Sequence, residues 1–230
     1  MAGQALPYKR KNAKTSMDKA RHLDLIQHYI ANVAIGTTTL RNQGADGIAD
    51  AAREFLACLD ISELKEKPVT EYRSWLDKKT KELMKKFPSG AKKDWGGARK
   101  AMNLLMVGAY FNKVLSKKYK LDRFENDLET PLDGGAAERI REYGRKKGVE
   151  WECKLCSKDA RKSCKGQHPR CGKSKFPGIV NLKDYQSRGY QGIATELAKE
   201  IGLPRAELDI ILWRKTGEEW KEFLRNISRE

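Results

Sequence analysis

The sequence predicts an all-α protein with one small inserted segment. Apolar residues recur at helical spacing along nearly all of the 230 residues, and strand-like alternation is scarce. The length of the chain allows one large domain or two small ones. Hydrophobic residues make up 39% of it, which is enough for a core. Four cysteines fall in a short basic stretch that lacks the apolar residues for its own core. We therefore expect a helical body with a cysteine-rich insertion.

Four helices are predicted in the first half of the chain, over residues 18–34, 45–61, 69–87 and 98–118. The first has one apolar face, formed by Leu23, Ile26, Ile30 and Val33. The third stops at Pro88, because Pro, Ser and Gly in sequence favour a turn. The buried face expected for the fourth consists of Ala101, Leu104, Leu105, Gly108, Phe111 and Leu115.

The apolar spacing in the second half of the sequence predicts further helices on both sides of the insertion. Pro131 begins a connection into a helix over 134–143. Apolar residues from 193 to 201 form another helical stripe, which Gly202 and Pro204 end. Helices over 205–214 and 217–227 then close the chain. The helical body therefore resumes after the insertion.

The charge balance favours a polyanionic partner. Lys and Arg total 47 against 31 Asp and Glu, a formal net charge of +16. The excess is clustered: residues 73–100 hold ten basic against three acidic residues, and residues 145–175 hold eleven against three. Such clusters predict surfaces that follow phosphates, most often those of nucleic acid, although two solvated faces are the alternative.

These patterns predict the domain boundaries. Residues 1–15 form a mobile basic arm without the apolar segment of a secretory signal. Residues 16–148 and 177–230 form the helical body, and residues 149–176 form the insertion. No apolar run approaches membrane-spanning length, so we expect no membrane partner. The predicted protein is a cytoplasmic, nucleoid-associated monomer with reduced cysteines.

The insertion predicts a structural metal site. Cys153 and Cys156 have the C-x2-C spacing that lets two thiolates reach one metal ion. Cys164 and Cys171 would complete a tetrahedral Zn²⁺ site, with His168 as an alternative ligand to Cys164. Four thiolates also suit a [4Fe–4S] cluster, and elemental analysis distinguishes the two. Four protein ligands leave no open position for a substrate, so the role is structural.

Lys100 lies in the segment "WGGARKAMNLLM", at the expected start of the fourth helix. Gly96 and Gly97 permit a tight turn, and free N–H groups at a helix start can bind phosphate. A lysine in the first turn meets the positive end of the helix dipole, and partial burial adds to the effect. Both lower its pKa and favour a nucleophile able to form a Schiff base. An ordinary surface lysine is the alternative in so basic a chain.

Two motifs resemble the helix-hairpin-helix DNA glycosylases, especially the endonuclease III branch. "GGARKAMN" resembles their hairpin motif at Gly96, Arg99, Lys100 and Asn103, although Ala98 replaces the second hairpin glycine. "PLDGGAAERI" resembles the segment that presents their essential aspartate, with Gly134-Gly135 in place of the usual Thr-His. The matching residues of that segment are Pro131, Leu132, Asp133, Ala137, Arg139 and Ile140.

The spacing of the motifs extends the resemblance. Thirty-three residues separate Lys100 from Asp133, closer to the archaeal 8-oxoguanine glycosylases than to the endonuclease III branch. Arg41, Asn42 and Gln43 occupy the place of the superfamily's polar wedge turn. "LDIILWR" is placed like the late helix beside the active site, where Trp213 could stack on a flipped base. The resemblance covers residues 20–145 and 180–215.

The resemblance implies a bifunctional DNA glycosylase and abasic-site lyase acting on damaged duplex DNA. Lys100 would attack the sugar of an extruded nucleotide, and Asp133 would take its proton and stabilise charge on the sugar. Gly96, Gly97 and Arg99 would bind the DNA backbone, and residues 41–43 would enter the duplex. The excised base remains open: 8-oxoguanine is favoured by analogy, beside deaminated bases, oxidised pyrimidines or a modified phage base.

Two other functions remain as alternatives. Charge and cysteines alone predict a non-catalytic, zinc-containing nucleic-acid-binding protein, in which Asp133 is only a helix cap. A metal-dependent nuclease is less favoured, because the sequence lacks a carboxylate cluster suited to Mg²⁺.

Overall fold

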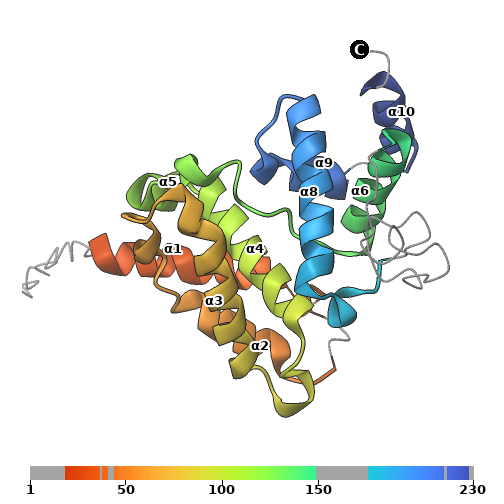
Figure 1. Ribbon diagram of the computed structural model, residues 1–230. Helices are drawn as coiled ribbons and strands as arrows, with labels where there is room; N and C mark the ends of the chain where they lie inside the picture. The colour runs from red at the N-terminus through yellow and green to blue at the C-terminus, as the bar shows by residue number, and fades with distance from the viewer. Residues whose placement is uncertain (1–18, 37, 41–43, 149–175, 215–216, 228–230) are drawn as a thin grey trace, which may run out of the picture.

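The computed structural model describes residues 19–36, 38–40, 44–148, 176–214 and 217–227. Within these ranges the chain forms α-helices and short 3-10 helices and contains no strand, so the all-α prediction is confirmed. No helix in the described ranges has the length and apolar character needed to cross a membrane. The helices form two groups, each around its own core (Figure 1).

The first group of helices is built from the N-terminal half of the chain. Its α-helices are α1 (Lys19–Ala34), α2 (Ile48–Ala57), α3 (Tyr72–Lys86), α4 (Trp95–Phe111) and α5 (Lys113–Tyr119). Short 3-10 helices connect them: η1 (Ile61–Leu64), η2 (Val69–Glu71), η3 (Ser89–Ala91) and η4 (Leu121–Phe124). The core is contributed by all of these α-helices, and Leu56, Leu76 and Leu105 are fully buried in it.

The predicted fourth helix is wrong at both ends. It begins at Trp95, three residues earlier than expected, because the Asp94 carboxylate caps it. It also breaks at Asn112, whose Oδ1 accepts hydrogen bonds of 3.1 Å from the N–H groups of Val114 and Leu115. This side chain caps a separate helix, α5. Phe111, expected in the core, is 48% exposed as a result of its place at this break.

The buried face of α1 is narrower than expected. Ile30 is buried, and Leu23 and Ile26 pack against the first core. Val33 was expected on the same face but is 64% exposed, together with Tyr29. The apolar residues of α1 occupy a wider arc than the stripe that packs on the core, so Val33 and Tyr29 face solvent.

The second group of helices contains the C-terminal half. It consists of α6 (Gly134–Lys146), α8 (Asp184–Glu200), α9 (Leu208–Arg214) and α10 (Gly217–Ile227), with η5 (Ile179–Asn181) and η6 (Arg205–Glu207). Its core centres on Ile140, Leu197 and Leu212, and Trp220 of α10 packs into it. Residues before and after the insertion therefore share one core.

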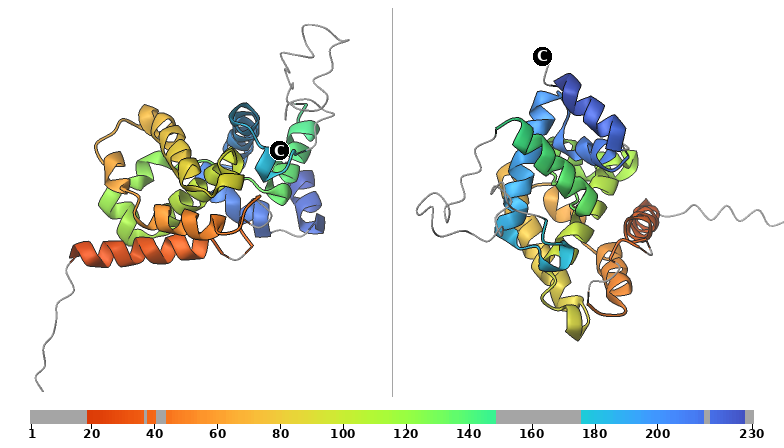
Figure 2. Two further views of the ribbon diagram at one scale, coloured as in Figure 1. Left: turned by 90° about the horizontal axis from the view of Figure 1, so that it is seen from below. Right: turned by 90° about the vertical axis from the view of Figure 1, so that its right-hand side faces the viewer.

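Helix α4 lies between the two groups. The three views place α3 and α8 on one side of α4, and α1, α9 and α10 on the other (Figures 1 and 2). Its first turn packs so closely on η5 that a Cβ at Gly96 would stand 1.9 Å from the Ile179 carbonyl oxygen. Residues near the start of α4 can therefore meet side chains from both halves of the chain.

Candidate active site

Lys100 is the sixth residue of α4, in its second turn. The prediction that it lies in the first turn is wrong, because Asp94 starts the helix earlier. The helix dipole acts mainly within the first turn, so it contributes little here. Burial instead lowers the pKa of Lys100, while the charges of Asp133 and Asp209 raise it by a smaller amount.

The Lys100 ammonium group faces residues from distant parts of the chain. Its Nζ donates to the Thr39 carbonyl oxygen at 3.4 Å, and it stands 4.0 Å from Oδ2 of Asp133. The side chains of Lys100 and Asp133 keep 12% and 24% of their surface exposed. The fold thus brings together the two residues that the motifs predict as nucleophile and proton acceptor, and leaves both accessible.

Asp133 uses its two carboxylate oxygens differently. Oδ1 accepts a hydrogen bond of 2.9 Å from the N–H of Ala136 and caps α6. Oδ2 points towards Lys100. The cap fixes the side chain, so the helix-capping role and a role beside Lys100 are compatible.

Helix α9 supplies a second carboxylate that the sequence analysis missed. Asp209 lies in its first turn, close enough for its charge to raise the pKa of Lys100. Arg139 of α6 donates to the carbonyl oxygen of Leu212, which ties α9 to the helix that Asp133 caps. Trp213 follows Asp209 by one turn and is 64% exposed, so its proposed stacking on a base is sterically open. The segment "LDIILWR" located this helix but did not single out its aspartate.

The two glycines do not form the expected phosphate site. Gly96 is buried against η5, and the N–H of Gly97 already donates to Asp94 Oδ1 at 2.7 Å. A carboxylate at that position would repel phosphate. The prediction of phosphate binding by Gly96 and Gly97 is therefore wrong; both glycines serve packing and capping.

Arg99 is likewise not available to DNA, contrary to prediction, because it is 1% exposed. It donates to both oxygens of the buried Glu129, at 2.8 and 3.2 Å, and to Asp77 of α3 at 2.6 Å. Burial alone would raise the pKa of Glu129, yet the charges of Arg99 and Arg73 and the hydrogen bonds from Arg99 and Asn103 hold it below its ordinary value. Arg99 thus links α4 to α3 and to the segment that contains Glu129, in the interior of the protein.

This ion pair joins the segments that bear the two candidate catalytic groups. Arg99 immediately precedes Lys100, and Glu129 precedes Asp133 by four residues. Asn103, one turn further along α4, donates to Glu129 at 3.2 Å. Asn103 is therefore one of the residues that resemble the hairpin motif, but its side chain is buried and bonds Glu129.

A second contact fixes the same connection from the other side. The N–H of Thr130 donates to Oε1 of Gln191 at 3.0 Å, and Nε2 of Gln191 donates back to the Thr130 carbonyl at 2.8 Å. Gln191 belongs to α8, so this segment is clamped between α4 and α8. Local motifs could not predict Glu129 or Gln191, because each acts on residues far away in sequence.

A narrow gap beside Lys100 does not accommodate a nucleobase. It is lined by Gly96, Leu132, Leu182 and Ser187 with residues of α4, and it is too small for a water molecule.

Several predicted residues lie outside the described ranges. The wedge residues among them are Arg41, Asn42 and Gln43; the proposed metal ligands are Cys153, Cys156, Cys164, Cys171 and His168. Among the residues that the structure describes, no three His, Cys, Asp or Glu side chains gather to hold a metal ion. The zinc or iron–sulfur site remains a prediction.

Comparisons of the chain with protein-family models, curated proteins and solved structures give no match. The resemblance to helix-hairpin-helix glycosylases therefore stays a prediction from short motifs, and the candidate site rests on the geometry given above.

Proposed function

We propose that the protein is a DNA glycosylase with abasic-site lyase activity, which excises a damaged base through a Schiff base on Lys100. The observation that supports this most is the approach of Lys100 Nζ to within 4.0 Å of Asp133 Oδ2, on an amine that burial makes easier to deprotonate. The net charge of +16 fits a DNA partner.

In this proposal, Asp133 takes a proton from Lys100, and the neutral amine attacks the C1′ atom of an extruded nucleotide. The bond between C1′ and the base breaks, and the base leaves with the bonding electrons and gains a proton. The C1′–O4′ bond of the sugar ring then breaks, O4′ takes up the proton that Nζ loses, and a protonated imine remains between C1′ and Nζ. Loss of a proton from C2′ then expels the 3′ phosphate by β-elimination and nicks the strand.

The connection between α3 and α4 is the surface that we propose for DNA backbone contact near the site. Its exposed residues include Ser89, Gly90, Lys92 and Lys93. Hydroxyl and ammonium groups are common phosphate ligands. These residues replace Gly96, Gly97 and Arg99 in the proposed interface, and 8-oxoguanine remains the favoured substrate base by analogy alone.

Borohydride trapping tests the proposal. The protein is incubated with a panel of duplexes that contain an abasic site or one damaged base, in the presence of borohydride, which reduces an imine to a stable covalent adduct. We expect an adduct and a nicked strand with at least one duplex, and we expect Lys100→Gln to abolish both.

Lys113→Gln serves as the matched control, because Lys113 is an exposed lysine at the start of α5, beyond the C-terminal end of α4, whereas Lys100 lies near the N-terminal end of α4. It should leave trapping unchanged. An undiminished adduct in Lys100→Gln would remove Lys100 from the mechanism. Tight, salt-dependent DNA binding with no adduct on any duplex would favour the non-catalytic, zinc-containing nucleic-acid-binding protein instead.

A further inference from the structure

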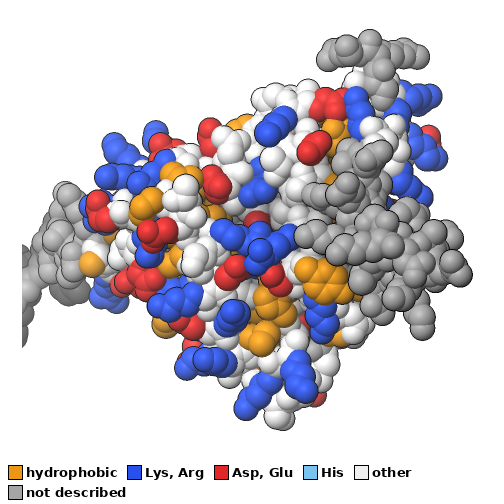
Figure 3. All heavy atoms as spheres, viewed as in Figure 1, with side chains coloured by type: hydrophobic (Ala, Val, Ile, Leu, Met, Phe, Trp, Pro, Cys, Tyr) orange, Lys and Arg blue, Asp and Glu red, His pale blue; other side chains and the backbone are white. Residues whose placement is uncertain are grey.

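A basic groove lies between α3 and α8. It has a volume of about 770 Å³ and an open shape on the surface. Five basic side chains line it, against two carboxylates: Arg73, Lys78, Lys81, Lys85 and Arg188. Figure 3 shows Lys and Arg side chains gathered on this face of the molecule, over the lower part of α3. A groove with this excess of positive charge attracts a polyanion.

The α3 side of the groove presents a single row of hydrogen-bond donors. Thr70, Ser74, Lys78, Lys81 and Lys85 recur at intervals of three or four residues, and all five are exposed. Residues at this spacing lie on one face of a helix. The three lysines are separated by about 5 Å along the helix axis. Hydroxyl and ammonium groups in a row are suited to consecutive phosphates of one strand.

Both carboxylates of the groove are already paired with basic side chains. Asp77 accepts from the buried Arg99 at 2.6 Å and pairs with Arg73 at 3.3 Å. Glu82 pairs with the buried Lys79 at 3.4 Å. Within the described part of the chain, Lys81 and Lys85 form no ion pair. Lys78 stands 4.0 Å from Glu82, so the charges of Lys81 and Lys85 are the ones that remain to face an external partner.

The groove and the Lys100 site open on opposite faces. Lys100 meets Thr39, from the link between α1 and α2, and Asp209 of α9. The groove is formed by α3 and α8, and the views place α4 between these two sets of helices (Figure 2). Helix α4 therefore separates the groove from the Lys100 site.

We infer that the groove between α3 and α8 is a second DNA-binding site, which holds the phosphate backbone of a separate duplex segment without reading its sequence. This inference does not need Lys100 to be catalytic. A second site would let the protein hold two duplex segments at once, because each face binds one.

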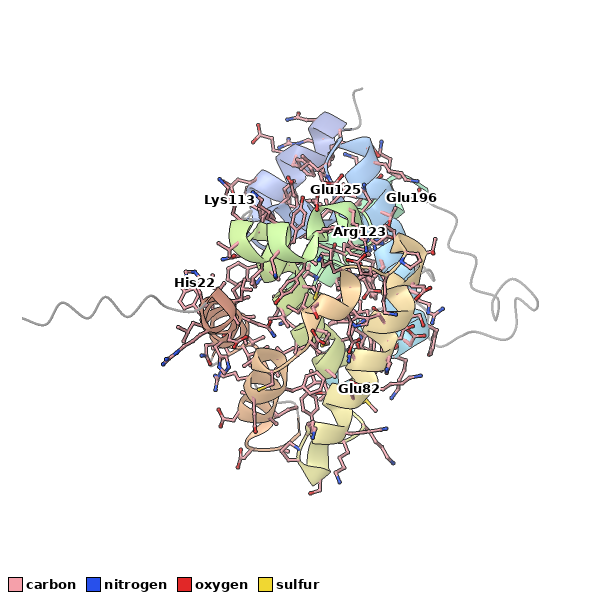
Figure 4. The ribbon with its side chains drawn as sticks, turned by 90° about the vertical axis from the view of Figure 1, so that its left-hand side faces the viewer. His22, Glu82, Lys113, Arg123, Glu125 and Glu196 are labelled. Atoms are coloured by element: carbon pink, nitrogen blue, oxygen red, sulfur yellow. The ribbon has the colours of Figure 1, made fainter. Side chains whose placement is uncertain are left out.

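The experiment uses the full chain and a short undamaged duplex of about one helical turn, with binding stoichiometry measured by sedimentation at low salt. The test variant carries Lys78→Gln, Lys81→Gln and Lys85→Gln. The control carries Lys113→Gln, Lys117→Gln and Lys118→Gln, which remove the same charge from exposed positions of α5. Figure 4 shows Lys113 well separated from Glu82, which lines the groove.

We expect two duplexes bound to the original protein and to the control, and one to the test variant. The logarithmic salt dependence of total affinity should also become shallower by about 2 to 3 in the test variant, since each phosphate contact contributes about 0.9. A test variant that binds like the control would overturn the inference. Borohydride trapping at Lys100 is measured separately, so the binding stoichiometry can be interpreted even if the catalytic proposal fails.

Discussion

Lys100 and its neighbours balance two opposing effects on one amine. Burial lowers the pKa of Lys100 and increases the fraction of nucleophilic amine, while Asp133 and Asp209 stabilise its charged form. Asp133 is held by its cap to Ala136, so one of these carboxylates is fixed in place. The other carboxylate, Asp209 on α9, can be changed to shift the pKa of Lys100 without altering Asp133, the proposed proton acceptor.

Asp209→Asn should move the pH profile of trapping to lower pH. Without this negative charge the ammonium form of Lys100 is less stable, so its pKa falls further and the neutral amine appears at lower pH. The measurement is the single-turnover rate of adduct formation against pH, on a duplex already shown to be trapped. Asp122→Asn, an exposed aspartate of η4, is the control. A profile that stays in place or moves to higher pH contradicts this assignment.

At the residue scale, local motifs predicted some partners and missed others. The pairing of Lys100 with Asp133 followed from two short motifs and is present in the structure. Arg99 was assigned to DNA through the resemblance of "GGARKAMN" to a DNA-binding hairpin motif. Its partner Glu129 lies thirty residues away, and a sequence pattern does not give the fold that brings them together.

The start of α4 depends on two glycines for packing. Gly96 lies against the backbone of η5, and Gly97 lies against the Asp94 carboxylate that caps the helix. A side chain at either position would displace a neighbour, and at Gly96 that neighbour is backbone. The first turn of α4 is therefore the rigid joint between the two groups of helices.

Gly96→Ala should lower the free energy of unfolding by more than about 2 kcal/mol, because the new Cβ would stand 1.9 Å from the Ile179 carbonyl oxygen. Gly134→Ala is the matched control. Gly134 begins α6 and a Cβ there meets nothing within 4 Å, so the change should stabilise by about 0.5 kcal/mol. Urea unfolding measures both. Equal effects of the two substitutions would show that α4 does not pack on η5 this way.

At the element scale, periodicity predicted that helices exist better than where they end. Residues 19–34, 72–86 and 217–227 match the expected helices closely. The end of α4 was missed because the apolar pattern continues past Asn112. The helix nevertheless ends there, because the Asn112 side chain caps α5 with two hydrogen bonds, and such a cap does not change the spacing of apolar residues. The start was missed because glycines suggested a turn, whereas Asp94 makes them helical.

The whole molecule is two groups of helices joined by a buried ionic cluster. Glu129 receives Arg99 from α4 and pairs with Arg73 from α3, and Arg73 also pairs with Asp184 of α8. The charged side chains of this cluster therefore link the two groups of helices. Such clusters are sensitive to the loss of one partner, because the remaining charge is left buried.

Glu129→Gln should lower the free energy of unfolding at pH 7 by roughly 3 kcal/mol, since Arg99 loses its buried counter-charge. The folded protein holds the pKa of Glu129 below its unfolded value, so the unfolded chain binds more protons between the two values. The stabilisation by Glu129 is therefore complete above about pH 5 and is lost as pH falls through the folded pKa.

Unfolding free energies measured from pH 7 to pH 3 check this sign. The original protein should lose more stability on acidification than Glu129→Gln does, and Glu54→Gln, at an exposed glutamate of α2, should behave like the original. Identical acid slopes for the original protein and Glu129→Gln would contradict the charged state assigned to the cluster.

The most direct test of the central claim is to locate the covalent bond itself. The borohydride-trapped complex is digested, and the peptide that bears the sugar remnant is sequenced by mass spectrometry. The proposed mechanism predicts the remnant on Lys100, within the segment that follows Gly96 and Gly97. A remnant on any other lysine, or no adduct with any duplex of the panel, would contradict it.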